Sequence, residues 1–201
     1  MGRTSDARER IVRTAARLFL TRSYTSVGVG EICAAADVRK GSFYHYFPAK
    51  TDVAIAVIDL HAAGLEQRLR EAGAAEPAQA LRGVALAVGR IQLGFEERFG
   101  QVVGCPFGNL AAELSTADTV VREHLAAVFA TWRQRIAAVC HRAAAHGLLR
   151  KGTDPDRLAA AVLAHAQGLI LLAKVDNSPA VDIAEAIDDL ITAHLAEGAP
   201  V

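Results

Sequence analysis

The chain has 201 residues, 52% of them hydrophobic, and its formal net charge is zero. This length allows a sizeable core in one domain or in two small ones. The abundance of Ala and Leu, with few β-branched runs, favours helices and argues against a protein built from β-sheets.

The zero net charge hides an uneven distribution. Residues 1–50 contain nine Lys and Arg against four acidic residues, a net charge of +5, whereas residues 51–201 contain thirteen against eighteen, a net charge of −5. A basic N-terminal quarter is a candidate surface for a polyanion. An ordinary solvated helix explains the charge equally well, so both interpretations stay open on charge alone.

Cysteine use and hydropathy indicate the compartment. Cys33, Cys105 and Cys140 form neither a CxxC pair nor an even disulfide set, which predicts a reducing interior. Charged residues interrupt any apolar run near the N-terminus, so no signal peptide is expected. The most hydrophobic stretch, residues 159–175, falls short of a clean membrane span, and a buried helix explains it better. We expect a soluble, cytoplasmic protein without membrane contact.

Hydrophobic periodicity predicts a first helix over residues 6–21, in which Ile11 and Phe19 share one face. After a connector, a second and shorter helix starts near Gly28. We expect Gly28 to act as its N-cap and the carboxylate of Glu31, three positions on, to reach back to the cap amide.

A third helix is predicted over residues 39–46 and ends before Pro48. Asp37 lies in the tight turn that precedes it, since Asp tolerates left-handed backbone angles. Phe43 and Phe47 are four residues apart and share a buried face. Two short helices joined by such a turn form a helix-turn-helix, whose second helix normally enters the major groove of DNA.

These helices carry a distinctive run of residues. It reads IVRTAARLF, then a spacer, then TSVGVGEICAAADVRKGSFYHYFPAKTDV, and its most specific part is GSFYHYFPAK, with an aromatic pair, a Tyr-His step and a trailing Pro and Lys. Over about residues 8–56 the chain resembles the N-terminal domain of TetR-family transcription regulators. The later segment GCPFGNLAAELS resembles a subset of the family's more variable bodies.

The chain departs from the family pattern in and after the second helix. Gly28 stands where a capping Ser or Thr is usual, Val29 where a phosphate-touching hydroxyl is common, and Gly30 where a polar or basic side chain often reads bases. Asp37 replaces the usual turn glycine. The second helix is therefore expected to read DNA poorly, which shifts recognition onto the third.

The resemblance thus implies DNA contacts from the third helix and the start of the fourth. Lys40 and Ser42 are expected to reach base edges, since Lys favours guanine acceptors, and Tyr44 with His45 to contact phosphates. Gly41 allows a close backbone approach. The full predicted DNA-binding set is Arg39, Lys40, Gly41, Ser42, Tyr44, His45, Tyr46 and Lys50.

Six more helices are predicted in the remainder, which makes about nine in an all-α fold. Their expected ranges are 49–71, 77–99, 106–114, 118–146, 155–175 and a ninth helix capped by Ser178-Pro179. We assign residues 1–50 to a three-helix helix-turn-helix domain. Residues 51–201 are assigned to a helical bundle for ligand binding and dimerisation.

The eighth helix is apolar on nearly every side, so it needs two covers. One is its own bundle, and the natural second is a partner subunit that packs helices eight and nine into a four-helix interface. A fully internal helix is the alternative. The side chains predicted at the dimer interface are Leu158, Val162, Leu169, Leu172, Ile187 and Ile191.

Cys105 has two interpretations. It opens a short helix, where amide dipoles lower the pKa of a thiol, and the resemblance implies an electrophile or redox sensor, because some relatives with a similar Cys work that way. A small buried residue at a helix cap is the alternative, and the burial typical of free Cys favours it.

Aromatic and polar residues in the body are candidates for an effector pocket, although each alone is more often a structural residue. The predicted set is His61, Phe95, Phe99, Cys105, Phe107, Asn109, Trp132, Arg133 and His165. No motif for zinc, phosphate-loop, serine-hydrolase or metalloprotease chemistry is present, so we expect no metal, no cofactor and no enzyme. A DNA-binding protein without a ligand is a weaker interpretation, because the body, residues 51–201, is three times the size of the DNA-binding head, residues 1–50.

The resemblance implies a repressor that binds a near-palindromic double-stranded DNA operator as a homodimer. A small-molecule or electrophile effector, bound in the body, would tilt the fourth helix and change the spacing of the two recognition helices. The effector and the operator sequence are not predicted.

Overall fold

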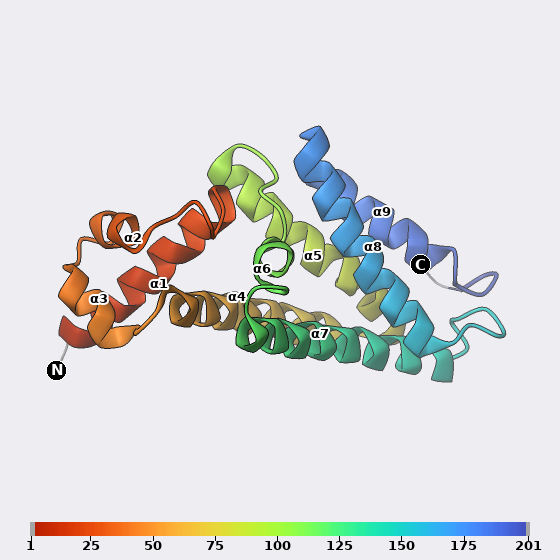
Figure 1. The fold of residues 1–201 in the computed structure, drawn as a ribbon. Coiled ribbons are helices and arrows are strands. Elements are labelled where there is room, and N and C mark those ends of the chain that lie inside the picture. Colours follow the sequence, from red (N-terminus) through yellow and green to blue (C-terminus); the bar gives the residue numbers. More distant parts are fainter. Residues whose placement is uncertain (1–2, 200–201) are drawn as a thin grey trace. The chain divides into compact units, whose positions relative to one another are not determined.

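The computed structural model describes residues 3–199, and within this range the chain forms nine α-helices and no β-strand (Figure 1). The all-α prediction is therefore confirmed. The helices are α1 (Arg3–Thr21), α2 (Val29–Ala35), α3 (Lys40–Tyr46), α4 (Lys50–Gly73), α5 (Pro77–Phe99), α6 (Pro106–Leu114), α7 (Thr119–Ala145), α8 (Pro155–Asp176) and α9 (Val181–Thr192).

Proline and glycine set several helix ends. Pro77 and Pro106 occupy the first turns of α5 and α6, where the missing N–H costs no helical hydrogen bond. Gly100 ends α5 in the left-handed region, with φ of 77°. Asp154 caps α8 by accepting hydrogen bonds from the amides of residues 156 and 157. Asp37 takes a φ of 52° in the turn before α3, as expected.

One predicted cap is confirmed in part, and a second is wrong. Gly28 is the N-cap of α2, as expected, but the carboxylate of Glu31 does not reach back to it and pairs with Arg22 instead. Ser178 does not open α9: its amide donates to the carbonyl of Ala173 after the left-handed turn at Asn177, so this segment ends α8.

The contacts divide the chain into two compact units. Unit 1 comprises residues 1–63 and 105–127, and unit 2 comprises residues 64–104 and 128–201. Helices α4 and α7 each contribute to both units, and α6 belongs to unit 1. A functional boundary at residue 50 stays a prediction.

Unit 1 is built around α1. Helices α2, α3 and α6 contact it, and α2 contacts α3 (Figure 1). Ile11 of α1, Ile32 of α2 and Phe43 of α3 are fully buried at the centre. The ring centroid of Phe43 lies 5.9 Å from that of Phe47, so the predicted pair fixes α3 by its buried side.

Unit 2 packs α9 against both α5 and α8. The crossing of α5 and α9 is close: a Cβ added at Gly89 would lie 2.5 Å from the Cβ of Ala184. The apolar stripe of α9 is buried, and its members are Ile183, Ile187 and Ile191.

This packing buries most of the predicted dimer interface within one protomer. Leu158, Val162, Ile187 and Ile191 are buried inside the protomer and offer nothing to a partner. The reason is that periodicity cannot say which side of a doubly apolar helix the bundle covers. Of the predicted set, Leu172 is exposed and Leu169 is partly exposed.

The uncovered side of α8 is also apolar. It presents Leu171, Leu172 and Val175, with exposed fractions of 59, 58 and 71%, and the space around Gly168 is open. Among the described helices, α8 alone is long and apolar enough to cross a membrane by length and composition, a test that core helices of soluble proteins also pass.

Candidate nucleic-acid interface

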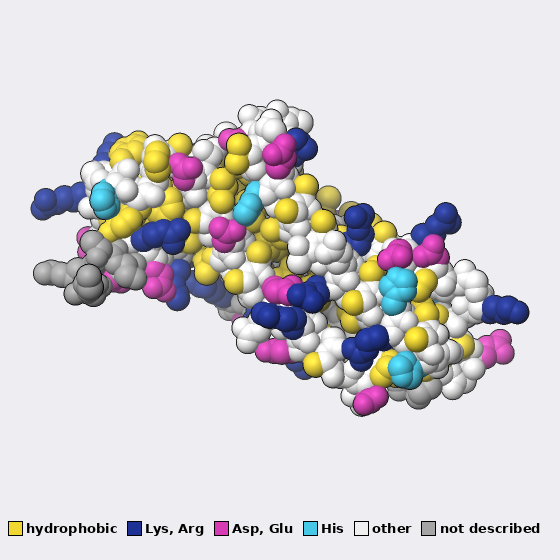
Figure 2. All heavy atoms as spheres, turned by 90° about the horizontal axis from the view of Figure 1, so that it is seen from below, with side chains coloured by type: hydrophobic (Ala, Val, Ile, Leu, Met, Phe, Trp, Pro, Cys, Tyr) yellow, Lys and Arg dark blue, Asp and Glu magenta, His cyan; other side chains and the backbone are white. Residues whose placement is uncertain are grey.

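Helix α3 presents a polar and aromatic face away from its buried phenylalanines. Arg39, Lys40 and His45 are exposed, and the ring of Tyr44 is 52% exposed. Ser42 and Tyr46 are partly exposed. The structure therefore places the α3 members of the predicted DNA-binding set on one exposed helix. Figure 2 shows basic side chains and a histidine on the part of unit 1 formed by α1–α3.

Glycines shape the surroundings of this face. A Cβ at Gly30 would lie 3.4 Å from the Cε of Lys40, so the bare backbone of α2 gives the stem of Lys40 room to lie beside it. Around Gly41 nothing lies within 4 Å, which leaves the first turn of α3 open to a close approach. Gly30 thus contributes space for Lys40 rather than a side chain of its own.

Several basic residues of the head already form hydrogen bonds or ion pairs within the protein. Arg10 donates to the carbonyl oxygens of Ala36 and Asp37, at the end of α2, and also pairs with Asp6. Arg13 pairs with Glu9. Arg39 and Lys40, by contrast, form no ion pair within residues 3–199. The charges of Arg39 and Lys40, beside and on α3, are therefore available to a polyanion.

Lys50 has a different role from the predicted one. Its Nζ donates to the carbonyl oxygens of Tyr24, at 2.8 Å, and Val27, at 2.9 Å, and lies 3.9 Å from the centre of the Tyr24 ring. Burial lowers the pKa of Lys50, against the opposing effect of Glu113. Two of its three N–H groups are used inside unit 1, so Lys50 holds the head together rather than lying open on the α3 surface.

No sequence pattern predicted that an acidic side chain from α6 binds the same loop as Lys50. Glu113, near the end of α6, accepts hydrogen bonds from the amides of Tyr24, at 2.9 Å, and Thr25, at 2.8 Å. Burial raises the pKa of the Glu113 carboxyl, but these two amides and Lys50 outweigh it and bring the pKa below its usual value. Residues 22–28, which we call the α1–α2 connector, are thus held from α6 and from α4.

The predicted effector residues of unit 1 lie around the start of α6. Cys105 is the buried N-cap of this helix, and Phe107 is buried in its first turn. The ring of Phe107 meets that of His61 of α4 edge to face, with centroids 6.3 Å apart. Burial lowers the pKa of His61 to about 4, so this imidazole is neutral at physiological pH. Asn109 is partly exposed in the same helix.

The remaining predicted effector residues belong to unit 2. Phe95 and Phe99 form a tilted pair on α5, and Trp132 stacks on Phe129 of α7. Trp132 is 4% exposed, and its Nε1 has no hydrogen-bond acceptor among the described residues. Arg133 is exposed and His165 is partly exposed.

Gln92 of α5 also buries a polar atom without a hydrogen-bond partner among the described residues, and this residue was not predicted. Its side chain is 2% exposed, and its Oε1 accepts no hydrogen bond within residues 3–199. A polar residue inside an apolar helical stripe was the available signal. An unmade buried hydrogen bond costs about 1–3 kcal/mol, so both atoms are suited to a bound polar molecule.

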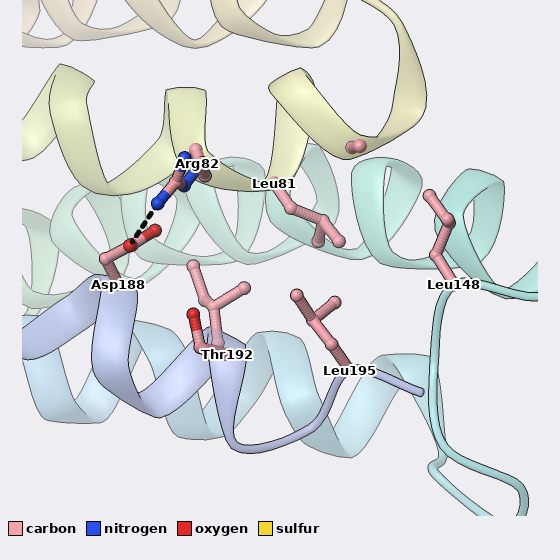
Figure 3. Close-up of a pocket in the computed structure, with 8 residues that line it drawn as sticks. Leu81, Arg82, Leu148, Asp188, Thr192 and Leu195 are labelled. Atoms are coloured by element: carbon pink, nitrogen blue, oxygen red, sulfur yellow. Dashed lines mark hydrogen bonds and ion pairs between the residues drawn. The ribbon is translucent and has the colours of Figure 1, made fainter. Parts of the chain in front are cut away.

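The described part of each unit contains a hollow, and none of the nine predicted effector residues lines either of these two. In unit 2, Leu81, Leu148 and Leu195 point into a cavity of about 10 Å³ beside the ion pair of Arg82 and Asp188 (Figure 3). That volume holds about one water molecule. In unit 1, an open groove of about 500 Å³ lies between α1 and α4.

Two family models match the chain. "Bacterial regulatory proteins, tetR family" covers residues 11–57, the segment that contains α2, α3 and most of α1. "Tetracyclin repressor-like, C-terminal domain" covers residues 87–187, about half of the chain. The match of the first model to the helix-turn-helix and of the second to the body agrees with the resemblance recognised in the sequence.

Individual relatives agree with these models. The transcriptional regulator AcuR of Cereibacter sphaeroides is 36% identical over 86% of this chain and 78% of its own length. The repressor DhaR of a Mycobacterium species is 31% identical over 89% and 87%. A crystal structure of a regulatory protein TetR from Rhodobacter sphaeroides has a TM-score of 0.82 and 34% identity, over 94% of this chain and 99% of that one. Reduced NemR of Escherichia coli has a TM-score of 0.81 and 25% identity, over 98% and 99%.

These relatives are transcription regulators rather than enzymes. The α3 surface, the two family models and the identity over most of the chain lead to the same conclusion. The protein belongs to the TetR family of bacterial transcription regulators, DNA-binding repressors with a ligand-binding C-terminal domain.

Proposed function

We propose that this chain represses transcription by binding a near-palindromic operator through α3, with Lys40 and Ser42 at base edges and Arg39, Tyr44 and His45 at phosphates. The observation that carries the proposal is the exposed, basic and aromatic face of α3, whose Phe43 is buried together with Phe47 at the helix end. Lys50 is not included in the contact set, because its ammonium is bound to the connector.

The proposed repressor is a homodimer formed through the uncovered side of α8. Leu171, Leu172 and Val175 form a contiguous exposed apolar surface, which is unusual on a monomer. The exposed Ala161 and Ala164 and the open space at Gly168 would let a second helix approach closely. A two-fold dimer would present two α3 helices to major grooves about 34–36 Å apart.

We propose that a small-molecule effector binds in the body and weakens operator binding. The buried oxygen of Gln92 and the buried N–H of Trp132 have no partners among the described residues, and each supports a ligand that carries the complementary polar group. Effector binding would alter α4 and with it the spacing of the two heads. The coupling free energy between effector binding and operator binding would be about 1–3 kcal/mol. Whether Cys105 senses electrophiles stays a prediction, and its buried side chain favours core packing.

The proposed location is the cytoplasm, where the operator lies. The test of the proposed function is selection of bound duplexes from a random double-stranded library, followed by anisotropy titration of the enriched sequence. We expect a two-fold symmetric consensus with nanomolar affinity that falls steeply as salt increases. Enrichment of no sequence over the starting library would contradict the proposal.

A further inference from the structure

The α1–α2 connector has an unusual set of hydrogen-bond partners. Its amides at Tyr24 and Thr25 donate to the two carboxylate oxygens of Glu113, one to each. Its carbonyl oxygens at Tyr24 and Val27 accept from the ammonium of Lys50. The same short loop is therefore held at both kinds of backbone group. An acidic side chain from α6 binds its N–H donors, and a basic side chain from α4 binds its carbonyl acceptors.

The connector leads directly into the helix-turn-helix. Gly28, the N-cap of α2, follows the last gripped residue immediately, and α2 packs against α3. The connector is also anchored by its own side chain, since the Tyr24 ring is buried and lies 5.1 Å from the ring of Phe19. A shift of the connector is therefore transmitted to α2 and, through the packing of α2, to the recognition helix.

Helix α6 connects Glu113, which binds the connector, to the buried N-terminal end of the helix at Cys105. It has nine residues, so its length is about 13 Å, and Leu110 and Leu114 are buried along it. Its first turn places Phe107 against His61, and its last turn presents Glu113 to the connector. A short rigid helix with these two ends moves as one piece.

We propose that Glu113 is a positioning residue for operator binding: its carboxylate, together with Lys50, fixes the connector so that α2 and α3 are held in the DNA-binding arrangement, and the place of α6 sets that of the head. This inference rests on the proposed operator binding. Glu113 itself contacts no DNA in this account, and it acts through the connector.

To bind both connector amides, the side chain at position 113 needs both the charge and the shape of a carboxylate. Glu113→Gln preserves the size of the side chain but presents an NH₂ group to one of the two amides, so one hydrogen bond is replaced by a clash of donors. Glu113→Asp keeps both oxygens on a shorter stem. Glu123→Gln is the matched control, because Glu123 is exposed on α7 in the same unit and pairs only with Arg122 among the described residues.

The first measurement needs no DNA. Hydrogen exchange of the full-length chain, read by NMR or by peptides that cover residues 22–28, should show the amides of Tyr24 and Thr25 protected in the wild type. We expect exchange there to rise about tenfold or more in Glu113→Gln, less in Glu113→Asp, and not in Glu123→Gln. Unchanged exchange in Glu113→Gln would overturn the proposal.

The second measurement uses the duplex enriched from the random library by the wild-type chain, titrated by anisotropy at several salt concentrations. We expect Glu113→Gln to raise the Kd about fivefold to fiftyfold, with an unchanged active fraction and an unchanged salt slope, since no phosphate contact is lost. Glu113→Asp should recover part of the affinity. A purely structural role would instead lower the active fraction and leave the Kd of the folded protein as it was.

The outcomes separate the two proposals. A wild-type chain that enriches no duplex overturns the proposed function and this inference with it. Wild-type binding that Glu113→Gln leaves within twofold overturns this inference alone. Lys50→Met should resemble Glu113→Gln, and the double variant should be no worse than about the stronger single one, because both residues hold the same loop. Full additivity of the two effects would contradict a shared grip.

Discussion

The two units distribute polar and apolar groups in opposite ways. In unit 1 the phenylalanines of α3 are inside and its cations are outside, and the inward-facing ammonium of Lys50 and carboxylate of Glu113 are bonded to backbone groups. In unit 2 large apolar side chains of α8 are exposed, while Gln92 and Trp132 bury polar atoms without partners in the described chain. The inward-facing charges of unit 1 are therefore satisfied by its own backbone, whereas unit 2 has large apolar side chains at its surface and polar atoms without partners in its described interior.

This difference indicates what each unit still requires. Exposed cations on a well-satisfied framework suit a polyanion, which needs charge at the surface and little rearrangement. Exposed apolar side chains suit a second protein surface, and buried polar atoms without partners among the described residues suit a small polar molecule. The difference supports the proposals that the head binds DNA as it stands and that a second subunit and an effector complete the body.

The largest effect is expected where the apolar surface of unit 2 is charged. Leu172→Glu should convert a micromolar dimer into monomer or aggregate, because an unpaired charge in an apolar interface costs several kcal/mol. Sedimentation velocity measures the change. Val120→Glu is the control, since Val120 is similarly exposed on α7, in the other unit. A wild-type chain that sediments as a monomer would remove the need for a second protein surface.

The next effect concerns His61, the side chain of unit 1 whose pKa is shifted most by burial. His61 has a pKa of about 4 in the folded chain, against about 6.5 when unfolded, so the unfolded state binds more protons between these values. The free energy of unfolding should therefore fall as the pH drops from about 6.5 to about 4, by up to about 3 kcal/mol. Urea unfolding at each pH measures it.

The neutral variant His61→Gln provides the comparison for this pH dependence. Its unfolding free energy should change less than that of the wild type between pH 6.5 and 5. Glu113, whose folded pKa is lowered, loses its contribution only at more acidic pH, as the pH falls through that folded value. Parallel curves for the two proteins would mean that His61 is protonated as readily folded as unfolded.

A third effect concerns the charge that unit 1 displays. Lys40→Ala should weaken binding to the enriched duplex about tenfold to a hundredfold and relax the preference at one base position, as expected when a base-edge contact is lost. Anisotropy with a set of single-base variants of the duplex measures both. Arg122→Ala, on α7, should leave the affinity within about twofold. Equal losses for the two variants would indicate binding by charge without readout from α3.

The smallest effect is expected at the buried oxygen of unit 2. Gln92→Leu should leave the ligand-free protein equally stable or more stable by about 1 kcal/mol, since it removes an acceptor that no described donor satisfies. Urea unfolding measures this, with the exposed Gln101→Leu as control. A loss of more than about 1 kcal/mol would show that Gln92 is already paired, and unit 2 would then lack this reason to bind a ligand.

Local features of the chain were predictable because their signals are local. The starts of α5 and α6 follow from Pro77 and Pro106, and the left-handed turn at Asp37 follows from the residue type. The exposed face of α3 follows from the spacing of Phe43 and Phe47 together with the family resemblance.

Long-range features were not predictable by the same reasoning. Glu113 lies 89 positions from Tyr24, and no spacing rule connects them. Lys50 matched the family pattern, but a sequence does not show that its ammonium meets two carbonyl oxygens. On α8 both faces are apolar, so the choice between core and surface depends on where α9 packs, which only the structure shows.

The bare glycine at the crossing of α5 and α9 acts as a pivot. Without a side chain at Gly89, the two helices approach until Ala184 fills the gap, and neither can slide along the other without first moving apart. They can tilt about this point, which lies near the middle of the 23 residues of α5. Because each arm of the lever is about 15 Å long, a tilt of about 5° displaces its ends by about 1 Å. Gly89 thereby allows a small angular adjustment in unit 2 and forbids a translation.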